Sequence, residues 1–167
     1  KKDVVIGVSA SGMTPFVRGS LTRARRAGSK IIFVTCDPRT ELQTFVDLTI
    51  APAVGPEIIA GSTRLKAGTA TKIVLNMLTT ASMIRIGKTY GNLMVDLQST
   101  NDKLKDRAER LVITTTGLTR DEARKLLADA HGHVKVAITM QKLGLDRAAA
   151  LARLAELGDE VAEAIEP

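Results

Sequence analysis

Aromatic residues and cysteine are scarce in this chain of 167 residues, which has no Trp, one Tyr, three Phe and one Cys. The core must therefore be built from Val, Ile, Leu, Met and Ala. A single cysteine excludes an internal disulfide and favours a reducing compartment, so we expect a cytoplasmic protein. This residue, Cys36, ends the apolar run of residues 31–36, and we expect a buried thiol at a strand end rather than a nucleophile.

Long apolar runs are also missing, since no stretch approaches the about 20 residues that a membrane-spanning helix needs, and we expect no membrane partner. The formal net charge of +6 is uneven, with 17 Lys and Arg against 9 Asp and Glu in residues 1–117, but 7 against 9 in residues 118–167. A basic half suits nucleic acid or an anionic small molecule. Nucleic-acid binding would use aromatic stacking platforms or a basic recognition helix, and neither is visible. We therefore predict a phosphorylated metabolite as ligand and no nucleic acid.

Strand and helix patterns alternate along the first fifty residues, which predicts an α/β fold with a parallel sheet and right-handed crossovers. Continuous apolar, β-branched runs are typical of buried parallel strands. In the first helix we expect Phe16, Leu21 and Ala24 to face inward. The expected elements are strands over Asp3–Val8, Lys30–Thr35 and Asp47–Ile50, a helix over Pro15–Ala27 and a short helix over Arg39–Phe45.

Three strands make a thin sheet for a doubly wound domain, so we expect further strands upstream. The chain starts at Lys1 without Met and enters a strand at once, which fits an α/β domain that is incomplete at its N-terminus.

Helical patterns fill the rest of the chain. We expect long helices over residues 64–86 and 99–115, then three short helices between Thr119 and Glu166. The first short helix has a capping box, Thr119 with Glu122, the second covers about residues 133–143, and the third begins after Asp146. The predicted organisation is a sugar-phosphate-binding domain with trailing helices over residues 1–117 and a three-helix module over residues 118–167.

A loop rich in hydroxyl groups follows the first predicted strand. Its sequence is Ser9-Ala10-Ser11-Gly12-Met13-Thr14, at the carboxyl end of a strand and before a helix, where open α/β sheets bind ligands. Free amides and the positive end of a helix dipole favour an anion there. We predict that Ser9, Ser11 and Thr14 bind a phosphate and that Gly12 allows a close backbone approach. The alternative is an ordinary helix cap, which also prefers Ser and Thr.

A second loop with hydroxyl and charged residues precedes the long helix. It contains Glu57 and then Ser62, Thr63, Arg64 and Lys66. The two cations could complement a phosphate or carboxylate, and the glutamate could orient hydroxyls or move a proton. The alternative is a capped and solvated helix start.

These segments resemble a known family. Residues 8–14, Val-Ser-Ala-Ser-Gly-Met-Thr, resemble the phosphate loop of the sugar isomerase (SIS) domain, a parallel-sheet domain of flavodoxin or Rossmann type. The stretches GPEIIAGSTRLKAGTATKIVLNMLTTASM and GKTYGNLMVDLQSTNDKL are similar to the N-acetylmuramic acid 6-phosphate etherases, to which the glucokinase regulatory protein is related. The resemblance covers nearly the whole chain.

This resemblance implies a carbon–oxygen lyase that cleaves the D-lactyl ether of N-acetylmuramic acid 6-phosphate, giving N-acetylglucosamine 6-phosphate and D-lactate in cell-wall sugar recycling. It implies no metal and no organic cofactor. Met13 stands where the family usually has arginine, and the family's catalytic glutamates precede the first strand of this chain, so by itself the chain is expected to be inactive. By position, Ser9, Ser11, Gly12 and Thr14 would bind the phosphate, and Ser62, Thr63, Arg64 and Lys66 the sugar, with Glu57 nearby.

Two other readings remain open. A non-catalytic sugar-phosphate sensor is favoured for the isolated chain by the absence of the catalytic glutamates. An aldose–ketose isomerase of the same domain type fits the first loop but not the later stretches. The tail resembles a small ubiquitin-associated-like module, which we expect to pack or to help form a homodimer. His131 and His133 lack partners at metal-ligand spacing, and we expect exposed side chains at a helix junction.

Overall fold

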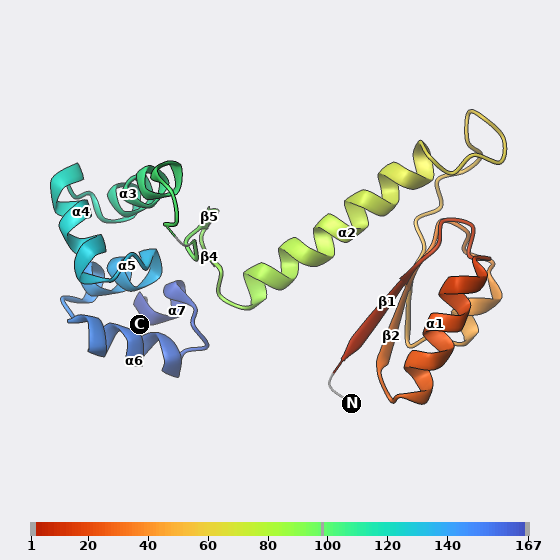
Figure 1. The fold of residues 1–167 in the computed structure, drawn as a ribbon, viewed down its shortest axis with the longest axis horizontal. Helices are drawn as coiled ribbons and strands as arrows, with labels where there is room; N and C mark the ends of the chain where they lie inside the picture. The colour runs from red at the N-terminus through yellow and green to blue at the C-terminus, as the bar shows by residue number, and fades with distance from the viewer. Residues whose placement is uncertain (1–2, 98, 166–167) are drawn as a thin grey trace. The chain divides into compact units, whose positions relative to one another are not determined.

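The computed structural model describes residues 3–97 and 99–165 and divides into two compact units, with the boundary between Leu78 and Thr79 (Figure 1). The first unit contains a parallel sheet and the second is mainly helical. An α/β fold followed by a helical part is thus confirmed.

The sheet of the first unit has three parallel strands in the order β1-β2-β3. Strand β1 is Val4–Val8, β2 is Lys30–Val34 and β3 is Leu48–Ile50. In register, Val8 lies beside Val34, which lies beside Ile50, so all three strands end at one edge. The loops that follow the strands therefore start from the same side of the sheet.

Helix α1, Pro15–Arg26, covers one face of this sheet. Gly7 leaves room for the helix, since a Cβ there would lie 2.8 Å from Leu21 Cδ1. A short 3₁₀ helix, η1, Glu41–Thr44, replaces the expected helix over residues 39–45. The buried members of this small core are Leu21, Ala24, Ile31, Phe33 and Leu42.

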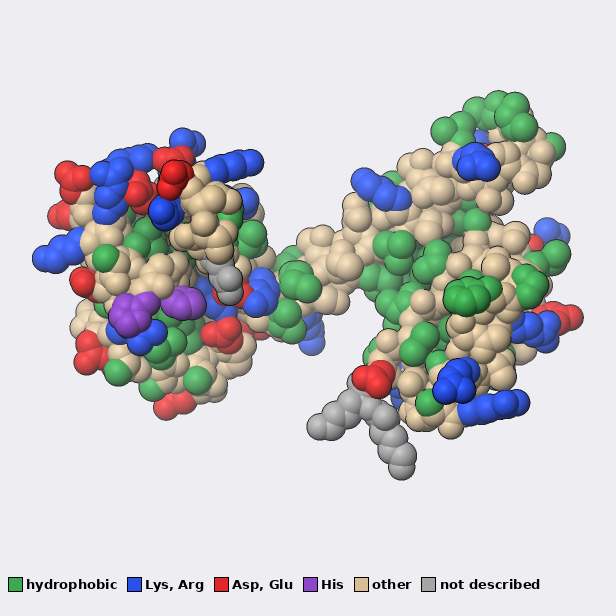
Figure 2. Space-filling view, viewed as in Figure 1, with side chains coloured by type: hydrophobic (Ala, Val, Ile, Leu, Met, Phe, Trp, Pro, Cys, Tyr) green, Lys and Arg blue, Asp and Glu red, His purple; other side chains and the backbone are tan. Residues whose placement is uncertain are grey.

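Two sequence expectations for this unit are wrong. Phe16 is 81% exposed instead of facing inward. Five residues separate Phe16 from Leu21, about 140° around a helix, whereas Val17 lies on the inner face and packs on the core. Strand β1 is not buried on both sides, because Val4 and Ile6 are 55% and 42% exposed on the face opposite α1. Figure 2 shows hydrophobic side chains at the surface of this unit.

Helix α2, Lys66–Arg85, continues across the boundary between the units. It is followed by a hairpin of β4, Thr89–Tyr90, and β5, Leu93–Met94. Among the described residues, no helix is long and apolar enough to cross a membrane.

The helical unit is built around α5, Val134–Leu143, in which six consecutive residues from Val134 to Thr139 are buried. Its neighbours are α3, Asp102–Thr116, α4, Arg120–Asp129, α6, Arg147–Glu156, and α7, Val161–Ile165. The capping box of Thr119 and Glu122 is confirmed. The expected third short helix is two helices, because Gly158 and Asp159 adopt positive φ angles of 67° and 68° that end α6. A separate module over residues 118–167 stays a prediction, and α3 packs against α4 and α5.

The two histidines lie between α4 and α5. Both are exposed, and Figure 2 shows them at the surface of the helical unit. His133 is the N-cap residue of α5, and His131 has a φ of 54°. In the described part of the chain, no group of three or more His, Cys, Asp or Glu side chains could hold a metal ion.

Candidate functional site

The loop after β1 is fastened to the end of β2. The amide of Ser9 donates to the carbonyl of Val34 at 3.0 Å, and the amide of Cys36 donates to the carbonyl of Ala10 at 2.9 Å. Within the loop, the amide of Gly12 donates to the carbonyl of Ser9 at 3.0 Å and forms a tight turn. These hydrogen bonds attach the loop to the carboxyl edge of the sheet.

Gly12 is required by geometry. Its φ is +72°, and a Cβ at this position would lie 1.9 Å from Cγ2 of Thr40. The close approach that we predicted is thus made to a side chain of the neighbouring loop. Contact between Gly12 and a phosphate stays a prediction.

The three hydroxyl side chains of this loop lie at the start of α1. Ser9 is 6% exposed, and its Oγ lies 2.8 Å from Oγ1 of Thr14. Ser11 and Thr14 are exposed. Thr14 is the N-cap residue of α1 but makes no side-chain capping bond, Pro15 opens the helix, and the first turn has no acidic residue. Among the described residues, neither the N-cap nor the first turn of α1 therefore supplies a side-chain acceptor, which argues against an ordinary cap.

The start of α2 is different, because the carboxylate of Glu57 occupies it. Oε2 accepts from the amide of Lys66 and Oε1 from the amide of Ala67, both at 3.0 Å. In return, Nζ of Lys66 donates to the carbonyl of Pro56 at 2.9 Å. The amides of Ala67 and Lys66 lower the pKa of Glu57, against the opposing effect of burial. This carboxylate is ionised at neutral pH and caps a helix.

The other residues predicted to contact the sugar lie in the loop that Glu57 closes. Ser62 is half-buried, and its amide donates to the carbonyl of Ile59 at 3.0 Å. Thr63, Arg64 and Lys66 are exposed.

The two loops meet at Cys36, directly after β2. Its amide binds Ala10 of the first loop, and its thiol donates to the carbonyl of Ala67 in α2 at 3.6 Å. The thiol also lies 3.7 Å from Oγ1 of Thr71. Cys36 is half-buried rather than fully buried. One residue thus connects the phosphate loop to the first turn of α2.

The sequence did not predict that one side of the phosphate loop borders a cavity. A cavity of about 350 Å³ lies there, and its wall includes Gly12, Arg18, Arg39 and Thr40. Arg18 lies 3.7 Å from Glu41, and Arg39 lies 3.5 Å from Asp37, so both cations already have carboxylate neighbours. The position of Arg18 one turn after Thr14 in a predicted helix was the signal available in the sequence.

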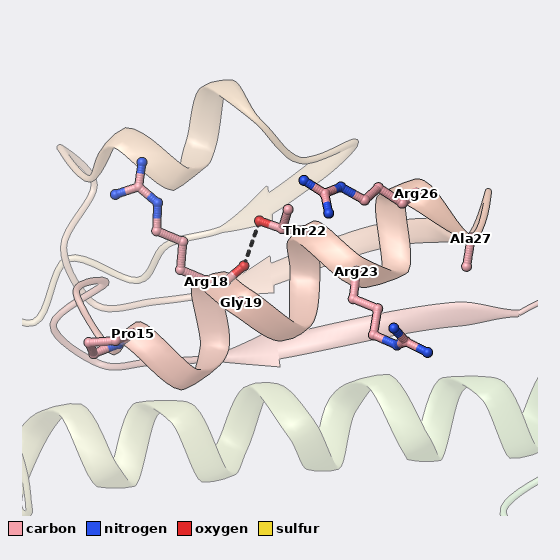
Figure 3. Close-up of a pocket in the computed structure, with 7 residues that line it drawn as sticks. All are labelled: Pro15, Arg18, Gly19, Thr22, Arg23, Arg26 and Ala27. Carbon is pink, nitrogen blue, oxygen red and sulfur yellow. Dashed lines mark hydrogen bonds between the residues drawn. The ribbon is translucent and has the colours of Figure 1, made fainter.

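A larger but more open concavity of about 630 Å³ follows the outer face of α1 (Figure 3). Three arginines, Arg18, Arg23 and Arg26, line it, and the hydroxyl of Thr22 donates to the carbonyl of Arg18 at 2.8 Å. The hydroxyl side chains of the phosphate loop do not line it. We therefore place the candidate site at the two loops rather than on this helix face.

Comparison with known proteins shows what the chain is similar to. Residues 1–81 match the SIS domain family, and this part contains both loops.

The chain is also similar to curated proteins of one kind along most of its length. It is 50% identical over 147 residues to the N-acetylmuramic acid 6-phosphate etherase of Clostridium botulinum strain Langeland, covering 88% of this chain and 49% of that protein. The etherase of Alkaliphilus metalliredigens is 48% identical over 165 residues, covering 99% and 54%. That of Mesorhizobium japonicum is 49% identical over 163 residues, covering 98% and 53%. The resemblance is confirmed, and the chain spans about half the length of these relatives.

Proposed function

We propose that this protein binds N-acetylmuramic acid 6-phosphate through its SIS domain and acts in cleavage of the D-lactyl ether, as a carbon–oxygen lyase of cell-wall sugar recycling. Support comes from the relatives, which are named N-acetylmuramic acid 6-phosphate etherases and share about half of the residues of this chain. A cytoplasmic homodimer, without metal or organic cofactor, belongs to the same proposal.

The contrast between two helix N-termini at one sheet edge carries the proposal. The start of α2 already holds a carboxylate, whereas in the described part of the chain the N-cap and first turn of α1 supply no side-chain acceptor, and the loop before α1 carries three hydroxyl groups. Amides at a helix N-terminus attract anions. The substrate phosphate would therefore bind at α1, with donors from Ser9, Ser11 and Thr14 and with Gly12 shaping the turn.

The sugar would lie toward the second loop. Ser62, Thr63 and Arg64 offer donors there, and Lys66 adds a cation at the first turn of α2. Cys36 binds both the phosphate loop and α2, which supports a ligand that reaches from one to the other.

The reaction that fits this substrate is elimination followed by hydration. A base removes the proton at C2, the C3–O bond breaks, and D-lactate leaves with a proton from an acid. Water then adds to the C2–C3 double bond and returns hydrogen to C2 and hydroxyl to C3. We assign neither proton transfer to Glu57, because its lowered pKa and its two amide bonds make it a poor acid and an engaged base.

A second candidate is a sugar-phosphate sensor without catalysis. The open N-terminus of α1 favours it as much as the lyase, because anion binding there needs no catalytic carboxylate.

Two measurements on the full-length protein separate these functions. Calorimetry would compare N-acetylglucosamine 6-phosphate with N-acetylglucosamine, and an enzymatic assay would follow D-lactate from N-acetylmuramic acid 6-phosphate. Phosphate-dependent binding with D-lactate release supports the lyase, and binding without release supports the sensor. Equal affinity for the two sugars would contradict the phosphate site, and light scattering of the same sample tests the homodimer.

The variant Ser11→Ala tests the phosphate loop. Loss of a hydroxyl that donates to a charged phosphate is expected to weaken binding of the sugar phosphate by about 1–3 kcal/mol. Ser20→Ala, on an exposed position of α1, is the matched control and should leave the affinity unchanged. Equal affinities for wild type and Ser11→Ala would remove Ser11 from the site.

A further inference from the structure

The second loop of the candidate site is closed on itself by polar contacts. The carboxylate of Glu57 binds the amides of Lys66 and Ala67, and the ammonium of Lys66 binds the carbonyl of Pro56. These contacts join residues 56 and 57 to residues 66 and 67. We refer to them as the Glu57 clamp.

Apolar packing does little to hold this loop. Ile58 and Ile59 are 73% and 70% exposed, and Leu65 is 55% exposed. Gly55 and Gly61 have positive φ angles of 69° and 83°, with no heavy atom within 4 Å of a Cβ built at either position. Since the large apolar side chains of the loop contribute little burial, the polar clamp is its main fastening.

The clamp also sets where the loop lies relative to the phosphate loop. Ala67 donates its amide to Glu57, and its carbonyl accepts from the thiol of Cys36. The amide of Cys36 in turn binds Ala10 of the phosphate loop. A short chain of contacts therefore runs from Glu57 through α2 to the loop that we assign to the phosphate.

We propose that Glu57 is a positioning residue, which holds the loop closed so that Ser62, Thr63 and Arg64 are presented to the sugar. This rests on the proposed function, because it assumes a sugar phosphate at these loops. Glu57 acts through the backbone and does not itself contact the substrate. The loop between its two fastened ends selects the sugar, while the phosphate is bound separately at α1.

The test compares Glu57→Asp, Glu57→Gln and Glu57→Ala. Aspartate keeps both acceptor oxygens on a shorter side chain. Glutamine keeps one acceptor and turns an amide group toward a backbone donor, and alanine keeps neither. The clamp should therefore be kept best in Glu57→Asp and less well in Glu57→Gln and Glu57→Ala. Glu156→Gln, an exposed glutamate at the end of α6, is the control.

The first readout needs no ligand. Trypsin cleaves after Arg64 and Lys66, which are exposed beside the clamp. In ligand-free protein, opening of the clamp should accelerate cleavage at these two sites at least about tenfold in Glu57→Gln and Glu57→Ala, and less in Glu57→Asp. Hydrogen exchange of the amides of Lys66 and Ala67 should accelerate in parallel. Cleavage at the wild-type rate in all three variants would contradict the clamp. A residue that only contacts the sugar would not protect the loop from trypsin when no ligand is bound.

The second readout separates sugar from phosphate. Affinity for N-acetylglucosamine 6-phosphate should fall about tenfold in Glu57→Ala, which corresponds to about 1.4 kcal/mol, while affinity for inorganic phosphate stays at the wild-type value. Faster cleavage with unchanged sugar-phosphate affinity would overturn the positioning role. Failure of the wild-type protein to bind the sugar phosphate would instead refute the proposed function.

Discussion

At the scale of single residues, two carboxylates of the first unit accept hydrogen bonds from backbone amides that lie far away along the chain. Glu57 caps α2, and Oδ2 of Asp47 accepts from the amide of Ile31 at 2.8 Å. In Asp47 this hydrogen bond is the main cause of a pKa below its ordinary value of 3.8, and the charges of Arg25 and Lys30 add to it against the effect of burial. Each carboxylate thus joins segments that are distant along the chain.

Asp47 should make stability depend on pH. Since its pKa is lower in the folded protein, its contribution is present above the ordinary value of 3.8 and is lost as the pH falls through the folded value. We expect Asp47→Asn to lower the urea midpoint at pH 7, with a difference that shrinks in acid. Urea titrations from pH 7 to pH 2 would measure it, with Asp3→Asn as the control. A difference that is constant down to pH 2 would show that ionisation of Asp47 does not contribute.

At the scale of secondary-structure elements, one buried lysine on α5 connects two distant segments of the helical unit. Lys135 is 6% exposed, and its Nζ donates to the carbonyl of Gly87 at 3.1 Å and to the carbonyl of Asp159 at 3.0 Å. It also pairs with the carboxylate of Asp159. Position 87 needs a glycine, because a Cβ there would clash with the carbonyl oxygen of Asp159 at 2.5 Å. The turn before α7 is thereby held against the segment after α2.

Replacement of this lysine should destabilise the helical unit. Lys135→Met keeps much of the side-chain volume but leaves two carbonyls without their donor, and we expect a loss of about 1–3 kcal/mol in the free energy of unfolding. The cost stays moderate because Asp159 is half-exposed and water can solvate its carboxylate. Chemical denaturation followed by circular dichroism would measure the loss, with Lys142→Met on the exposed part of α5 as the control. Equal stability of the two variants would contradict the role of Lys135.

At the scale of the whole molecule, the two compact units have separate hydrophobic cores and different charge. The first core gathers around Leu21 and Phe33, and the second around Val112 and Ile138. Residues 1–78 have 11 Lys and Arg against 5 Asp and Glu, whereas residues 79–167 have 13 of each. The whole net charge of +6 therefore belongs to the unit that contains the proposed phosphate site.

Separate cores predict separate responses to core mutations. Leu21 and Ile138 are each 0% exposed, so truncation to alanine should cost about 2–5 kcal/mol in its own unit. Hydrogen exchange with mass spectrometry should show faster exchange in residues 3–78 for Leu21→Ala, and in residues 79–165 for Ile138→Ala. Acceleration of both units by either variant would show that they unfold together.

The features that the sequence predicted correctly are those that depend on residues close together along the chain. Parallel strands follow from local apolar patterns, and the capping box at Thr119 follows from a side chain that binds an amide three residues away. The two site loops were also located, because hydroxyl-rich sequences between a strand and a helix mark the carboxyl edge of a sheet. Their ligand contacts remain predictions.

The sequence by itself thus determined the type and order of most elements, the position of both loops and the family resemblance, since each is written in short or contiguous stretches. Only the tertiary structure decided that Glu57 closes a loop onto Lys66 and Ala67, that Thr40 packs over Gly12, and that Phe16 and one face of β1 are exposed. It also split the last expected helix at Asp159, where Lys135 binds the turn. These outcomes depend on where the chain brings distant residues together, and local periodicity does not encode that path.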